Sequence, residues 1–123
     1  MTNYQIKGFK AAAVAAGIGK KQGPDLALIF SETDTVAAGV FTTNRVKAAP
    51  VILSRENIRD GRVRAIIANS GNANACTGTD GLDKARRTAQ LVAKELDIKS
   101  EEVLVASTGV IGAPGLNSRQ PGV

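Results

Sequence analysis

The apolar residues of this chain fall into short continuous runs, separated by polar and glycine-rich connections. Such runs, bounded by turn residues, are typical of buried strands, and we assign strands to 25–31, 36–42, 64–68 and 103–106. The short connection between the first two runs predicts a hairpin, so these two strands are expected to pair antiparallel. The alanine-rich segment 8–18 is bounded by glycines and has no charged face, which favours an extended conformation.

Helical periodicity is clearest over 80–96. Apolar residues recur there at spacings of three and four, with charged residues on the opposite side, which predicts an amphipathic helix. Its apolar side is mostly alanine, so it can pack closely on a sheet. A shorter helix is predicted between Pro50, a residue type favoured in the first turn, and Gly61. Strands mixed with helices predict an α/β (α+β) domain of layered sheet and helices.

Small aliphatic residues must supply the core of this domain. The chain has 123 residues, 43% of them hydrophobic, which suits one domain, but it contains only one Tyr and three Phe. Ala, Val, Ile and Leu therefore have to fill the space between the layers. We assign the domain to 1–112. The segment 113–123 is rich in Pro, Gly and polar residues, and we expect it to be a flexible tail.

The net charge of +5 raises nucleic acid or an acidic partner as a hypothesis. The basic residues are scattered along the chain, however, and aromatic residues are not interleaved with them as single-strand binding requires. A charged, solvated surface is the better interpretation. An anionic substrate remains compatible with this charge.

The lack of histidine restricts the chemistry available to the chain. Cys76 is the single cysteine, so there is no internal disulfide and no Cys-based metal site. Without a base beside it, Cys76 is better interpreted as a small buried or half-buried thiol than as a nucleophile. Acid–base chemistry must use carboxylates, Lys, an α-amine or residues outside the chain. No apolar run approaches the ~18 residues of a membrane span and no secretory signal is recognised, so we expect a soluble intracellular protein.

Two segments carry candidate chemistry. The segment 68–78 consists of small residues with three Asn, and it connects a predicted strand to a predicted helix. Such a connection lets the backbone approach another surface closely. Ser107-Thr108-Gly109 follows the last predicted strand, where a hydroxyl and a Gly N–H could form an oxyanion hole. On the residues alone, the same tripeptide is also a common strand end, and both interpretations stay open.

Three motifs occur in order, at 39–44 with 48–51, at 68–78 and at 105–112. Together they closely resemble the N-terminal part of ornithine acetyltransferase, the bifunctional glutamate N-acetyltransferase family of arginine biosynthesis. The resemblance covers about 8–112. It implies a cytoplasmic enzyme with the ornithine-acetyltransferase-like fold, of which this chain is an incomplete N-terminal portion of the α chain.

The resemblance also implies roles for particular residues. Thr108 and Gly109 correspond to the family's oxyanion-hole pair. The family cleaves its own precursor autocatalytically into α and β chains, and the Thr that begins the β chain is the nucleophile, so this chain contains none. The α-amine of that Thr can act as its base. The implied reaction moves acetyl from N-acetylornithine, or from acetyl-CoA as cosubstrate, to glutamate, with no bound cofactor and no metal.

The chain departs from the family pattern after Gly112. The rest of the α chain, which supplies Thr and Lys substrate contacts and ends before an Ala-Thr-Met cleavage site, does not follow. We therefore expect a truncated α segment, inactive alone, whose partners are the remainder of the α chain and the β chain in an αβ heterodimer that forms a heterotetramer. Neither nucleic acid nor membrane is an expected partner. The alternative is a noncatalytic fragment or interaction module with exposed sheet edges; a basic nucleic-acid-binding module ranks third.

Overall fold

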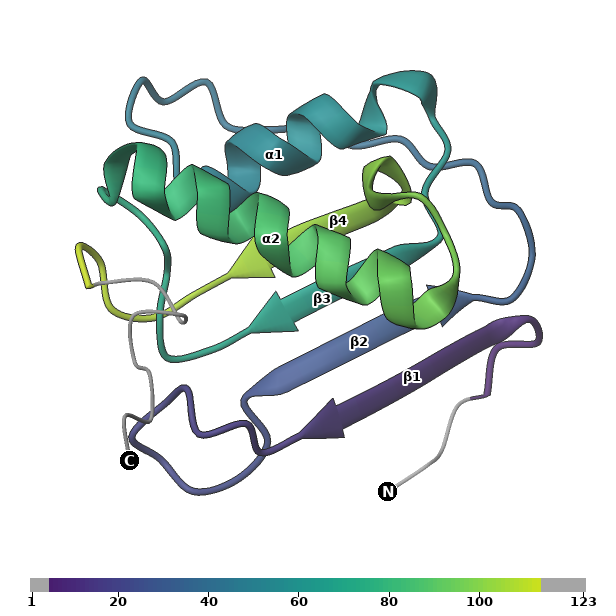
Figure 1. The fold of residues 1–123 in the computed structure, drawn as a ribbon, viewed down its shortest axis with the longest axis horizontal. Helices are drawn as coiled ribbons and strands as arrows, with labels where there is room; N and C mark the ends of the chain where they lie inside the picture. The colour runs from purple at the N-terminus through teal and green to yellow at the C-terminus, as the bar shows by residue number, and fades with distance from the viewer. Residues whose placement is uncertain (1–4, 114–123) are drawn as a thin grey trace.

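The computed structural model describes residues 5–113, which form a four-stranded sheet and two α-helices (Figure 1). The strands are β1 (Phe9–Val14), β2 (Leu26–Ser31), β3 (Ala65–Asn69) and β4 (Val103–Ser107). The helices are α1 (Ala49–Asn57) and α2 (Gly78–Leu96), with one-turn 3-10 helices at Ile58–Asp60 and Ser100–Glu102. The predicted α/β class is confirmed.

The strands lie in the order β1-β2-β3-β4. β2 pairs antiparallel with both β1 and β3, whereas β3 and β4 are parallel. A parallel pair needs a crossover connection, and α2 provides it. Ile67 in β3 lies opposite both Leu28 and Val105, so one set of alternating side chains is aligned across the sheet.

The core lies between the sheet and the two helices, which cover the same face (Figure 1). α2 meets the sheet with a stripe of alanines four residues apart, so that the helix comes close to the strands. Val103 in β4 is completely buried. The buried core residues are Ala49, Leu53, Ala65, Ile67, Ala85, Ala89, Ala93, Val103 and Val105. This is the small-residue core that the composition predicted.

α1 closes the outer edge of β4. The buried Ser54 hydroxyl donates to the Val105 carbonyl at 2.8 Å and accepts from the Val105 N–H at 3.0 Å. The Asn57 side-chain amide donates to the Val103 carbonyl at 2.9 Å and to the Ser100 carbonyl at 3.2 Å. These side chains replace the neighbouring strand that an edge strand otherwise lacks.

The opposite face of the sheet is apolar and largely uncovered within residues 5–113. Strand register places alternate residues of each strand on this face. Phe9, Ile29 and Ile66 remain 45%, 47% and 38% exposed. Its members are Phe9, Ala11, Ala13, Ala27, Ile29, Ile66, Ala68, Leu104 and Ala106. We call this set the open face.

The predicted strand 36–42 and its hairpin with 25–31 were wrong. Val36 forms only an isolated bridge with Arg62, and Val40 is 99% exposed. The reason is that β1 and β3 occupy both sides of β2, so no edge remains for a further partner. The apolar run instead belongs to a connection to α1 without regular secondary structure.

The other predicted elements agree with the structure to within a few residues. The extended segment 8–18 contains β1, and the short helix ends through a 3-10 turn at Gly61, whose φ of 73° is left-handed. The predicted tail, 113–123, lies outside the described residues except for Ala113.

Candidate active site

Thr108 and Gly109 directly follow β4, at the carboxyl ends of the two parallel strands. The Asn-rich loop follows β3 and therefore lies beside them. The crevice outside the carboxyl ends of parallel strands is where open α/β sheets bind ligands. The topology thus brings together the two segments that the sequence indicated.

Backbone hydrogen bonds join the Asn-rich loop to the segment after β4. The Thr108 N–H donates to the Asn69 carbonyl at 3.0 Å, and the Val110 N–H donates to the Gly71 carbonyl at 3.4 Å. In return, the Ala73 N–H donates to the Val110 carbonyl at 3.0 Å. The loop therefore holds the segment after β4 in place through backbone hydrogen bonds, in the close approach that its small residues predicted.

The residues on either side of Gly109, Thr108 and Val110, both donate their N–H to the Asn-rich loop. On the outer edge of β4, the side chains of α1 bond at Val103 and Val105 and not beyond them. Within residues 5–113, the Gly109 N–H has no acceptor and the Thr108 hydroxyl has no partner. Both residues are exposed. Two free donors on adjacent residues can stabilise negative charge on one oxygen atom.

The position of Gly109 depends on close backbone packing. With φ of 129°, a Cβ at Gly109 would overlap the carbonyl carbon of Gly71. Gly71 has a φ of 105°, and a Cβ added there would overlap the β1–β2 loop, because it would lie 2.6 Å from the Gly19 Cα. Only glycine fits at Gly109 and Gly71. Three loops therefore pack backbone against backbone at Gly19, Gly71 and Gly109, which we call the glycine stack.

Asparagine side chains organise the loop itself. The Asn72 carboxamide oxygen accepts from the Asn74 N–H at 2.8 Å. The Asn74 carboxamide donates to the Gly81 carbonyl and accepts from the Thr77 hydroxyl, both at 2.8 Å. Asn74 has φ of 49°, a left-handed conformation that Asn tolerates better than most residues. These bonds explain why the segment is rich in Asn.

Asp25 is the site-region residue that the sequence reasoning missed. It is 7% exposed, and its carboxylate accepts hydrogen bonds from the backbone of the β1–β2 loop. The Gly19 N–H, then those of Ala16 and Ile18, lower the pKa of the Asp25 carboxyl below its ordinary 3.8, against the opposing effect of burial. An acidic residue between a Gly-rich turn and an apolar run was the available signal.

Cys76 differs from its prediction. It was expected to be buried or half-buried, but it is exposed, in the last turn of the loop before α2, where it has a φ of 56°. No group of three or more His, Cys, Asp or Glu that could hold a metal ion comes together in the described part of the chain.

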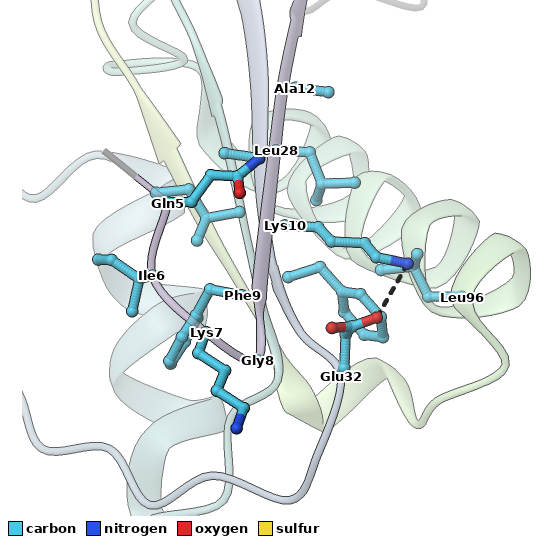
Figure 2. Close-up of a pocket in the computed structure, with 13 residues that line it drawn as sticks. Gln5, Ile6, Lys7, Gly8, Phe9, Lys10, Ala12, Leu28, Glu32 and Leu96 are labelled. Atoms are coloured by element: carbon cyan, nitrogen blue, oxygen red, sulfur yellow. Dashed lines mark ion pairs between the residues drawn. The ribbon is translucent and has the colours of Figure 1, made fainter. Parts of the chain in front are cut away.

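A hollow of about 1030 Å³ lies beside β1 (Figure 2). By the strand register it lies toward the end of the sheet away from Thr108. Leu28, Phe30 and Leu96 contribute apolar walls. Lys10 and Glu32 in its lining form an ion pair with each other at 2.9 Å (Figure 2). The hollow is therefore separate from Thr108 and Gly109, and the only ion pair among its lining residues joins Lys10 and Glu32.

The fold and the candidate site define a layered α/β domain with free hydrogen-bond donors at the ends of two parallel strands. The ArgJ family model matches residues 10–118. The chain belongs to the ArgJ family. None of the helices formed by residues 5–113 is long and apolar enough to cross a membrane.

Curated relatives support this assignment. The chain is 59% identical over 106 residues to "Arginine biosynthesis bifunctional protein ArgJ 1" of Clostridium acetobutylicum, covering 86% of this chain and 26% of that protein. It is 57% identical over 108 residues to "Arginine biosynthesis bifunctional protein ArgJ" of Caldanaerobacter subterraneus, covering 88% and 27%. The chain thus spans about a quarter of the length of these relatives.

Solved structures show the same fold. Arginine biosynthesis bifunctional protein ArgJ of Bacillus halodurans matches with a TM-score of 0.85 at 41% identity, covering 89% of this chain and 58% of that one. Ornithine acetyltransferase of Mycobacterium tuberculosis, solved in complex with ornithine, matches with a TM-score of 0.85 at 50% identity, covering 88% and 59%. The resemblance to the ornithine acetyltransferase family is confirmed, and the domain corresponds to a part of that fold.

Proposed function

We propose that this chain contributes the oxyanion hole of a glutamate N-acetyltransferase of arginine biosynthesis. The observation that carries the proposal is the pair of free donors, the Thr108 hydroxyl and the Gly109 N–H, on a backbone fixed by the Asn-rich loop. Membership of the ArgJ family supplies the biosynthetic context. The donor substrate is N-acetylornithine or acetyl-CoA, and the acceptor is glutamate.

The chemistry begins outside this chain. The hydroxyl of a Thr at the start of a β chain attacks the acetyl carbonyl, and its own α-amine takes the proton, since an unperturbed α-amine has a pKa of roughly 7.7–8.0. The carbonyl oxygen becomes negative in the tetrahedral intermediate. Thr108 and Gly109 donate to that oxygen. Ornithine leaves with a proton. The amine of glutamate then attacks the Thr ester, the new amide bond replaces the ester C–O bond, and the proton lost by the amine returns to the Thr oxygen through the α-amine.

A chimera tests this proposal. Residues 1–113 are joined to the remainder of ArgJ 1 from C. acetobutylicum, and transfer of acetyl from N-acetylornithine to glutamate is measured. Thr108→Ala removes one donor and should lower kcat about 10²–10³-fold, while Thr108→Ser keeps the hydroxyl and should restore much of the rate.

The matched control is Thr79→Ala. Thr79 is also exposed, in the first turn of α2, and its removal should leave kcat unchanged. An active chimera in which Thr108→Ala turns over like the unmodified protein would show that Thr108 is not a donor in the reaction. A folded but inactive chimera would reject the acetyltransferase assignment.

One observation favours the second candidate, a noncatalytic interaction module. The open face is apolar and largely exposed, and exposed apolar surface of this kind marks interaction sites. In this alternative, the chain binds another protein through the open face and Thr108 has no role. Binding that survives Thr108→Ala but is lost when the open face is charged would favour it.

A further inference from the structure

Asp25 connects two loops that converge on the candidate site. Its Oδ1 accepts from the Ala16 N–H at 2.6 Å, and its Oδ2 accepts from the Ile18 N–H at 2.6 Å and the Gly19 N–H at 3.0 Å. Its backbone carbonyl accepts from the Ser70 N–H at 2.9 Å. The side chain thus holds the β1–β2 loop, and the main chain of the same residue holds the Asn-rich loop.

Both loops meet in the glycine stack. Gly19 is bonded directly to the Asp25 carboxylate, and Gly71 follows Ser70, which is bonded to the Asp25 carbonyl. Gly71 packs on Gly19 on one side and on Gly109 on the other. A displacement of the β1–β2 loop therefore reaches Gly109 through a single intervening residue.

The environment of Asp25 excludes other roles for it. The carboxylate has no ion-pair partner within residues 5–113, so its charge is stabilised by backbone N–H donors alone. All three of these donors belong to one loop, and the group is almost wholly buried. It is placed to hold the backbone and not to exchange protons with a substrate.

We propose that Asp25 is a positioning residue for the oxyanion hole, which fixes the direction of the Gly109 N–H through Gly19 and Gly71. The catalytic meaning of this role rests on the proposed function. The structural part does not, because it concerns the coupling of Asp25 to the Gly109 amide in this chain. Misplacing a catalytic group by about 1 Å can cost roughly 10²-fold in rate, so such coupling matters for an oxyanion hole.

The structural part is tested by NMR on the 123-residue chain. Amide resonances are followed while the pH is lowered through the titration of Asp25. Gly109 should shift with the same midpoint as Ile18 and Gly19. A Gly109 amide that stays constant while Ile18 and Gly19 titrate would overturn the proposal, and this test needs no variant.

Variants separate the steps of the coupling. Asp25→Asn replaces one acceptor oxygen by a donor and should displace the Gly109 amide resonance, whereas Asp34→Asn, at an exposed site, should not. Gly71→Ala should displace Gly109 as well. Gly19→Ala is its matched control, since a Cβ there would lie an ordinary 3.8 Å from the Gly71 Cα.

The catalytic part is read in the chimera. Asp25→Asn should lower kcat about 10–100-fold with little change in KM. The substrate still binds, but the misplaced Gly109 N–H stabilises the oxyanion less well. An unchanged kcat in an active chimera, or a loss confined to KM, would overturn the positioning role. An unmodified chimera without activity counts against the proposed function alone. The NMR titration then tests whether Asp25 is coupled to the Gly109 amide.

Discussion

The Ser107 hydroxyl donates to the Asn69 side-chain oxygen at 2.6 Å, and these two residues are register partners at the ends of β4 and β3. Asn69 in turn donates from its amide to the Asn72 carbonyl at 2.9 Å. One side-chain bond therefore connects the end of the strand that leads to Thr108 with the scaffold loop beside it.

Ser107→Ala should destabilise the chain by about 1–2 kcal/mol, because the partly buried Asn69 oxygen loses its partner. Urea unfolding followed by circular dichroism measures the free energy of unfolding. Ser70→Ala is the control, since Ser70 is an exposed serine of the same loop. Equal stabilities of the two variants would contradict the importance of the Ser107–Asn69 bond.

The stability of the chain should depend on the ionisation of Asp25. Its pKa is lowered in the folded state, so the carboxylate contributes stability above its ordinary pKa of 3.8, and this contribution is lost as the pH falls through the folded pKa. The protein should therefore be more stable than Asp25→Asn at pH 7, and the difference should shrink below about pH 4. Urea midpoints of both proteins across this range measure the effect. A difference that stays constant with pH would refute it.

The 123-residue chain alone should transfer no acetyl from N-acetylornithine to glutamate. The proposed donors stabilise charge that develops only after a nucleophile attacks, and the nucleophile of the proposed reaction is the first residue of another chain. Mass spectrometry of N-acetylglutamate after incubation with the purified chain measures this. Sustained turnover that co-purifies with the chain would reject the assignment of the nucleophile to a β chain.

The open face should drive self-association of the isolated chain. Ile66→Lys places a charge at its centre and should shift the protein toward monomer in size-exclusion chromatography with light scattering. Leu91→Lys is the matched control, because Leu91 is an apolar residue on α2 that is 45% exposed. If both variants associate as the unmodified chain does, the open face is not the contact surface.

Local patterns predicted most of the fold, and the failure is informative. The alanine periodicity of α2 and the apolar runs of β2, β3 and β4 each depend on neighbours close in sequence, so they could be recognised. The run 36–42 has the same local character as those strands. It is not a strand because β1 and β3 pair with both sides of β2. The order of strands in the sheet is not contained in any local pattern.

The candidate site was predictable only in part. The motif at Thr108 and Gly109 could be found because its residues are adjacent in the chain. Asp25 could not, since its role depends on Gly71 and Gly109, which lie far from it in sequence and meet it only through backbone packing. The place of Asp25 between a Gly-rich turn and an apolar run was a signal for this residue, but the loop that its carboxylate holds is evident only in the structure.

The side chains of Ser54 and Asn57 determine which edge of the sheet can accept another strand. They form hydrogen bonds with the backbone groups on the outer side of Val103 and Val105, so another strand cannot pair with β4 at these positions. Among the strands formed by residues 5–113, β1 has a partner on one side only. Any strand that extends this sheet, whether from a longer ArgJ protein or from an aggregating neighbour, must therefore add beside β1, and the end of the molecule that carries Gly109 is left clear.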